Sequence, residues 1–263
     1  MKFYLIPPNN HLDMMHLGDS YFGLAHHYVK DPSYRQYFLD LRANTPEAFI
    51  TMDNSAAEHS LVTEDILLDI VEELKPNEVI APDVLFNKEK TLSNFYSFLL
   101  KMEHRKLLDH TSIFACPQGQ TKEDWLQCYY TMMTCPNVTC VGLSKIAVPK
   151  CWNDVTGDKL IGRSRNECVS ELQRLNFLRK PLHLLGMGEH NEFDFYLKNK
   201  IPNIRSSDSC YTVLAAINNI SFAEGNLTRI PTSNDYFDVN LTPDQKDLAG
   251  QNINFLKQNY STI

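Results

Sequence analysis

The segment Ile50-Thr51-Met52-Asp53 ends a short apolar run with a carboxylate. The same arrangement recurs at Val79-Ile80-Ala81-Pro82-Asp83 and at Ile204-Arg205-Ser206-Ser207-Asp208. A parallel α/β barrel places polar groups directly after several of its strands, because all of those strand ends open onto one face. The three segments therefore predict such a barrel, with a functional site at the carboxyl ends of its strands.

Further apolar runs of strand length alternate with helical patterns along the chain. Strand followed by helix, repeated in this way, is typical of a parallel sheet with helical connections. The length of 263 residues also suits one barrel, which commonly needs about 250. We therefore expect a single-domain (β/α)8 TIM barrel over 1–263, irregular at both ends. Seven strands are predicted at 3–6, 48–52, 78–81, 112–116, 138–143, 182–185 and 204–207.

Helices are predicted where apolar residues recur at helical spacing. The clearest helix covers 61–75, with Thr63 as its N-cap and Pro76 just beyond its end. Three others are predicted after Thr121, over 165–178, and over 242–260 with Thr242 and Pro243 at the start.

The two ends of the chain, 1–47 and 223–263, have the weakest patterns. Residues 13–41 look helical, and their role in the barrel is left open. The eighth strand has only 221–230 as its candidate.

The charge of the chain limits how it can hold nucleic acid. A net charge of -7 argues against binding through bulk positive charge. One basic stretch, 145–180, is a candidate phosphate-facing strip, and the alternative is a solvated helix face. Its basic residues are Lys145, Lys150, Lys159, Arg163, Arg165, Arg174, Arg179 and Lys180.

Several features predict a cytoplasmic protein. No run approaches the roughly 18 apolar residues that a membrane helix needs, and the starting apolar run stops at Pro7-Pro8. The seven cysteines include no CxxC pair, which indicates reduced thiols rather than a disulfide framework.

The carboxylates at the predicted strand ends suggest a reaction. Asp53 and Asp208 lie among small and polar residues. Two carboxylates facing a sugar can share a displacement at the anomeric carbon, one as nucleophile and the other as the group that moves the leaving group's proton. The alternative is that each residue simply caps the next helix.

Three loops could complete such a site. Gln118 and Gly119 follow a strand and could read a planar ligand, and Gly142 in Val141-Gly142-Leu143-Ser144 allows a close backbone approach. The alternative is an ordinary turn after a strand. A third loop, His183-Leu184-Leu185-Gly186-Met187-Gly188, lacks the spacing of a nucleotide fingerprint. His183 is equally compatible with a core role and a catalytic one.

The order of these motifs resembles that of the tRNA-guanine transglycosylases. The resemblance is closer to the shorter relatives of these enzymes, the DNA 7-deazaguanine transglycosylases of bacteria and phages. The resemblance covers about 49–216. Each motif is short and unspecific alone, and their shared order carries the resemblance.

The resemblance implies a role for each matching residue. Asp208 would be the nucleophile that holds the sugar covalently, and Asp53 the acid and base. Asp83 would pair with the N–H groups of a guanine-type base, an edge to which a carboxylate can accept two hydrogen bonds. The rest of the base would be read by Gln118, Gly119, Gly142, Leu143, Gly186 and Met187.

One departure bears on the substrate. The tRNA enzymes carry a zinc site of three cysteines and a histidine after the nucleophile, but here only Cys210 follows Asp208. This favours DNA over tRNA, with a free 7-deazaguanine-type base as second substrate and no metal or other cofactor. Contacts to DNA are expected from Lys145, Arg163, Arg165 and Arg174. The alternatives are the same chemistry on tRNA, a nucleoside or glycoside hydrolase, and an inactive barrel acting as a binding module.

Overall fold

The computed structural model describes residues 1–56, 62–157, 159–187, 192–225, 230 and 232–263. Eight parallel strands form one sheet in the order β1-β8-β7-β6-β5-β4-β3-β2. A parallel bridge between Tyr4 and Ser20 brings its two edges together. The strands are β1 (Lys2–Leu5), β2 (Tyr21–Leu24), β3 (Ile50–Asp53), β4 (Glu78–Ile80), β5 (Ser112–Ala115), β6 (Val138–Ser144), β7 (Leu182–Leu185) and β8 (Ile204–Ser209).

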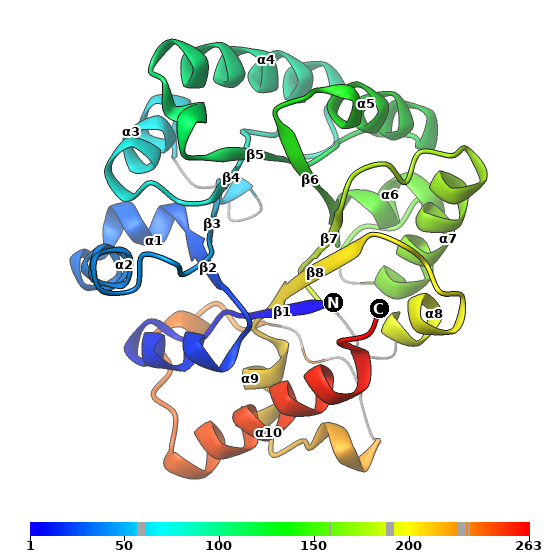
Figure 1. Ribbon diagram of the computed structural model, residues 1–263. Helices are drawn as coiled ribbons and strands as arrows, with labels where there is room; N and C mark the ends of the chain where they lie inside the picture. The colour runs from blue at the N-terminus through cyan, green and yellow to red at the C-terminus, as the bar shows by residue number, and fades with distance from the viewer. Residues whose placement is uncertain (57–61, 158, 188–191, 226–229, 231) are drawn as a thin grey trace.

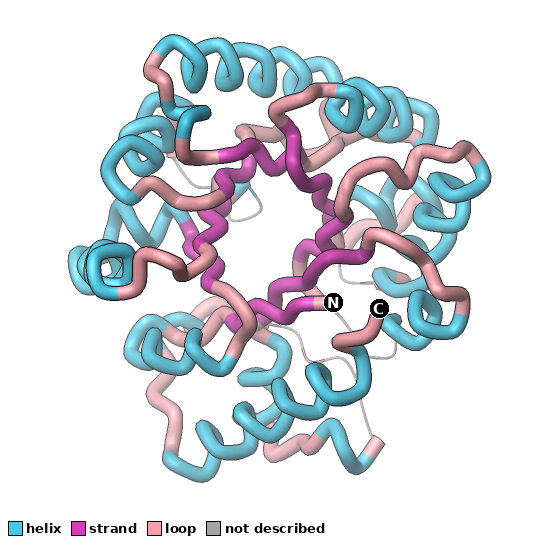
Figure 2. Tube along the Cα trace, viewed as in Figure 1, coloured by secondary structure: helices cyan, strands magenta, loops and turns pink. Residues whose placement is uncertain are grey.

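Helices surround this inner ring of strands, as Figure 2 shows. The fold is therefore the predicted (β/α)8 TIM barrel (Figure 1). The α-helices are α1 (Ala25–Lys30), α2 (Pro32–Asn44), α3 (Glu64–Leu74), α4 (Lys88–His104), α5 (Lys122–Thr134), α6 (Ala147–Asn153), α7 (Ile161–Arg174), α8 (Glu192–Lys198), α9 (Tyr211–Ile217) and α10 (Pro243–Tyr260). The 3-10 helices are η1 (Asn9–Leu17), η3 (Leu107–Asp109), η4 (Phe222–Glu224) and η5 (Tyr236–Asp238).

Three predicted helix starts are confirmed by their caps. The Thr63 hydroxyl accepts a hydrogen bond from the Ile66 amide at 3.3 Å, and Thr121 caps α5 in the same way. Thr242 begins α10 with a reciprocal capping box that includes Gln245. Each cap satisfies a backbone N–H that the first helical turn leaves without a partner. The helix predicted at 165–178 is present, but α7 begins and ends four residues earlier than predicted.

The eighth strand is not the one expected. Strand β2 lies between β1 and β3, within the 13–41 stretch that looked helical. It is only four residues long and contains Gly23, where a side chain would press on Met52 and Phe38. So short a run has no helical or alternating period, and its partner strands decide its conformation. Of the candidate 221–230, η4 is helical, and 226–229 lie outside the described residues.

Side chains fill the barrel below its mouth. At the amino ends of the strands, Arg205 of β8 reaches across to Glu78 of β4, with two hydrogen bonds of 2.6 and 2.8 Å. Above this pair, the imidazole of His183 is fully buried, with aromatic rings around it from Tyr4, Phe22 and Phe114. These layers fill the lower barrel, and a ligand site is therefore expected at the carboxyl ends of the strands.

The last helix ties the two ends of the chain together. Helix α10 packs against α9 and β1, and the amino group of Met1 donates to the carbonyl of Ser261 at 2.6 Å. Figure 1 shows both termini on the same side of the barrel. In the described parts of the chain, none of the helices has the length and apolar character needed to cross a membrane.

Candidate functional site

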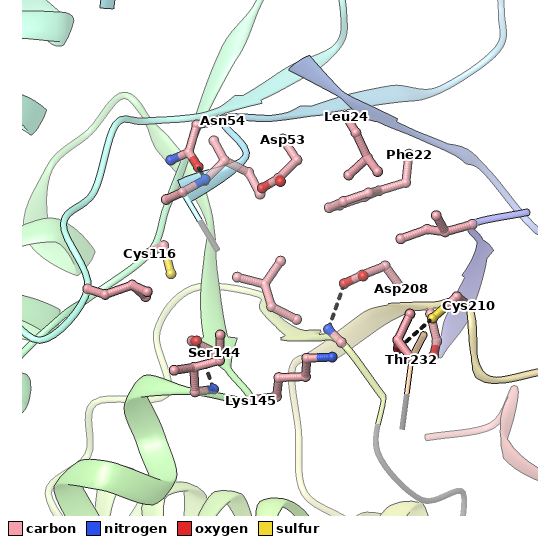
Figure 3. A pocket seen from close by; sticks show the side chains of 18 of the residues that line it. Phe22, Leu24, Asp53, Asn54, Cys116, Ser144, Lys145, Asp208, Cys210 and Thr232 are labelled. Carbon is pink, nitrogen blue, oxygen red and sulfur yellow. Dashed lines mark hydrogen bonds between the residues drawn. The ribbon is translucent and has the colours of Figure 1, made fainter. Parts of the chain in front are cut away.

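A cavity of about 500 Å³ opens at the carboxyl ends of the strands (Figure 3). Every strand contributes to its wall, through a strand residue or one that follows closely. Because successive strands of a barrel end on the same face, side chains distant in sequence meet there. Six residues predicted for the site line this cavity: Asp53, Asp83, Gln118, Lys145, Gly186 and Asp208.

Asp208 is held by one of its two carboxylate oxygens. Its Oδ1 accepts a hydrogen bond from His183 Nε2 at 2.8 Å and another from the Gly186 amide at 3.0 Å. The residue is 6% exposed and its carboxylate points into the cavity (Figure 3). Among the described residues both hydrogen bonds go to Oδ1, which leaves Oδ2 to face a substrate.

The contacts of His183 define its tautomer. An ionised carboxylate only accepts hydrogen bonds, so the proton lies on Nε2 and is donated to Asp208. Nδ1 then accepts from the Ser206 hydroxyl at 2.7 Å. Burial lowers the pKa of His183 below its usual value, against the opposing effect of Asp208, and so favours the neutral ring. His183 therefore acts as a positioning residue that orients the Asp208 carboxylate.

Asp53 is the last residue of β3 and lines the same cavity. Its Oδ2 accepts the amide of Ser55 at 3.0 Å, across a turn in which Ser55 has a positive φ of 61°. Strands β2 and β1 lie between Asp53 and Asp208 in the sheet order, and Phe22 of β2 lines the wall there. Figure 3 shows both carboxylates directed into the cavity.

A network of amides fixes the carboxylate of Asp83. Its Oδ1 accepts from Asn54 Nδ2 at 2.7 Å, and its Oδ2 accepts from Gln118 Nε2 at 2.6 Å. The other end of the Gln118 amide, Oε1, accepts the Phe86 amide at 3.1 Å. Gln118 is fully buried, so its orientation is set by the protein. Asp83 lines the cavity, where a carboxylate can accept hydrogen bonds from the N–H groups of a ligand.

Burial also changes the titration of Asp83. Desolvation raises its pKa from 3.8 to about 6, and the hydrogen bonds from Asn54 and Gln118 oppose that rise. The carboxylate is therefore ionised at neutral pH and becomes protonated in mildly acidic solution. A perturbed carboxylate in a cleft is a typical feature of functional sites.

Gly186 shapes the turn that follows β7. Its φ is +69°, a conformation that favours glycine, and a Cβ there would lie 2.6 Å from Lys145 Cδ. The glycine thus lets the lysine stem lie across the turn while its own amide reaches Asp208. Lys145, predicted to contact DNA as part of the basic stretch 145–180, lies in the cavity wall.

Four residues predicted to contact the base do not line the cavity. A Cβ on Gly142 would meet Leu185 at 2.5 Å, and Leu143 beside it is fully buried. Gly119 packs against the start of α5 near Trp125. Met187 is buried, and its amide donates to the Asp208 carbonyl at 3.0 Å. These four positions support the wall from behind. Gly188, the last residue of that motif, lies outside the described residues.

The basic strip is not a continuous surface. Arg165 is fully buried, where it pairs with Glu192 at 2.9 Å and donates to the carbonyls of Leu185 and Gly186. The prediction that Arg165 contacts DNA is therefore wrong, because this guanidinium braces the turn after β7.

The two other arginines predicted to contact DNA lie on the outer face of α7. Arg163 and Arg174 are 68% and 67% exposed, and each pairs with a glutamate of its own helix. Arg174 lies in the last turn of α7, which returns toward the amino end of β7, away from the cavity. Of the four residues predicted to contact DNA, Arg163 and Arg174 are thus the two exposed enough for a surface contact.

Sequence reasoning missed part of the wall. Thr232, Ser233, Asn234 and Phe237 close one side of the cavity, although the segment has no regular period. Tyr236 anchors it through a hydrogen bond of 2.6 Å to the Ile6 carbonyl. Asn54 could have been found, because it directly follows Asp53 at a strand end.

Among the residues that the structure describes, no cluster of three or more His, Cys, Asp or Glu side chains is arranged to hold a metal ion. A scan against models of known protein families found no match, and a search of curated proteins found none either.

Proposed function

We propose that this chain is a transglycosylase that replaces guanine in DNA with a 7-deazaguanine derivative. The supporting observation is that one cavity holds Asp208, Asp53 and the amide-bound Asp83. A nucleophile, a proton carrier and a reader of N–H groups are the three parts that such an exchange requires. Such an enzyme would work in the cytoplasm, and in the host's cytoplasm if a phage encodes it.

The exchange divides into two balanced displacements. In the first, Asp208 Oδ2 attacks C1′ of the target nucleotide, the bond from C1′ to the base nitrogen breaks, and Asp53 supplies a proton to the departing base. In the second, Asp53 takes the proton from the incoming base, whose nitrogen attacks C1′ and breaks the ester bond to Asp208. Splitting one difficult substitution into two steps is the usual advantage of a covalent intermediate. His183 and the Gly186 amide keep Oδ1 occupied, so the attacking oxygen is always Oδ2.

DNA is the proposed polymer because the zinc module of the tRNA enzymes has no counterpart in the sequence after Asp208. A hydrolase would use the same two carboxylates, with water in place of the incoming base. We expect labelled guanine to be incorporated into DNA and not into tRNA. Release of free base without incorporation would instead establish a hydrolase, and incorporation into tRNA would reverse the choice of polymer.

We expect Asp83→Ala to weaken binding of the free base by about tenfold or more, since a buried hydrogen-bonding partner is lost. Calorimetric titration with guanine measures this. In the wild type, affinity should fall as the pH drops through about 6, because protonation of Asp83 removes the acceptor. Asp109→Ala, an exposed change in η3, is the matched control. Unchanged affinity in Asp83→Ala, or a flat pH profile, would reject this role.

A further inference from the structure

Lys145 is held in the cavity wall by its contacts with Leu185 and Gly186. Its backbone amide donates to the Leu185 carbonyl at 3.1 Å. Its aliphatic stem lies against Gly186, where a Cβ would come within 2.6 Å of Cδ. Figure 3 shows the ammonium end directed into the cavity toward Asp208 and Cys210.

The ammonium group of Lys145 has no carboxylate within 4.0 Å among the described residues. Four other cations in this part of the chain are each paired with a carboxylate. These pairs are Lys150 with Asp154, Arg163 with Glu167, Arg165 with Glu192 and Arg174 with Glu171. A lysine in a cavity wall without a fixed counter-ion has its donors available for a ligand.

The cavity wall that holds Lys145 offers hydroxyl and amide groups in addition to the Asp208 carboxylate. Ser209, Thr232, Ser233 and Asn234 line the same cavity as Lys145 and Asp208. The carboxylates of Asp53 and Asp83 come instead from β3 and the loop after β4. Lys145 directly follows β6, so the cavity offers N–H acceptors at Asp53 and Asp83 and a cation that comes from a different strand.

We infer that Lys145 binds an anionic oxygen group of the substrate, a phosphate or a carboxylate, beside the carbon that reacts at Asp208. This inference rests on the proposed function. The base would lie at Asp83 and Gln118, the sugar at Asp208, and the anion at Lys145. The anion is either the phosphate of the target nucleotide or a carboxylate carried by the incoming base. The anion would add affinity, because a hydrogen bond between two charged groups is stronger than one between neutral groups.

Calorimetric titrations with paired ligands separate these sources. One pair is deoxyguanosine and its 5′-monophosphate, and the other is 7-deazaguanine with and without a 7-carboxylate. In the wild type we expect the anionic member of one pair to bind about tenfold more tightly than its neutral twin. Lys145→Met should remove this advantage and leave the affinity of the neutral twin unchanged. Lys150→Met, which removes a paired lysine on α6, should retain it.

Equal affinities within both pairs, or an advantage that survives in Lys145→Met, would overturn the inference. If no guanine ligand binds, the proposed function fails, and a separate measurement then tests the anion site by itself. Inorganic phosphate and acetate are titrated while the NMR signal of the Lys145 ammonium group is followed. A saturable shift at Lys145 that is absent at Lys150 supports an anion site, and the lack of saturation refutes it.

Discussion

Asp208→Asn is expected to reduce base exchange on the order of 10³-fold or more, because a neutral amide is a far weaker nucleophile than a carboxylate. The variant should also form no covalent adduct with DNA. Its fold should persist, since the amide oxygen can still accept the hydrogen bonds from His183 and Gly186. Label incorporation measures the exchange, and electrophoresis under denaturing conditions detects the adduct.

The matched control for this variant is Asp247→Asn, which alters an exposed carboxylate on α10. It should exchange bases at the wild-type rate. A denaturant-resistant adduct formed by Asp208→Asn would show that another residue attacks the sugar. Loss of activity with loss of the folded spectrum would indicate a structural role instead, and circular dichroism distinguishes the two.

Arg165→Met is expected to lower the free energy of unfolding by about 3–5 kcal/mol, the usual cost of breaking a buried ion pair. The guanidinium and the Glu192 carboxylate are both fully buried, so the substitution leaves a buried charge without its cation. The loss of donors to the carbonyls of Leu185 and Gly186 adds to the effect. Urea denaturation followed by fluorescence measures the change.

Two further variants test this explanation. The double variant Arg165→Met with Glu192→Met should recover much of the lost stability, because replacing a buried pair by apolar side chains is often close to neutral. Arg163→Met, two residues away and exposed, should change stability by less than about 0.5 kcal/mol. Wild-type stability in Arg165→Met would contradict the assignment of this residue as a structural brace.

The sequence by itself determined the architecture and the principal carboxylates of the cavity. Alternating strand and helix patterns indicate a parallel sheet, and the helix starts at Thr63, Thr121 and Thr242 depend only on residues within one turn. Asp53 and Asp208 could be placed in advance for a similar reason. A barrel directs all of its strand ends to one face, so strand assignment locates their side chains.

The tertiary structure decided what depends on partners distant in sequence. Strand β2 is defined by β1 and β3, since four residues have too little pattern of their own. Arg165 and Lys145 cannot be distinguished by sequence within the basic stretch, yet Arg165 is buried against Glu192 and Lys145 lies in the cavity wall. His183 was ambiguous until Ser206 and Asp208 were placed on either side of its ring. Local periodicity reports which face of an element is buried, whereas the neighbours of a buried polar group depend on how the whole chain packs.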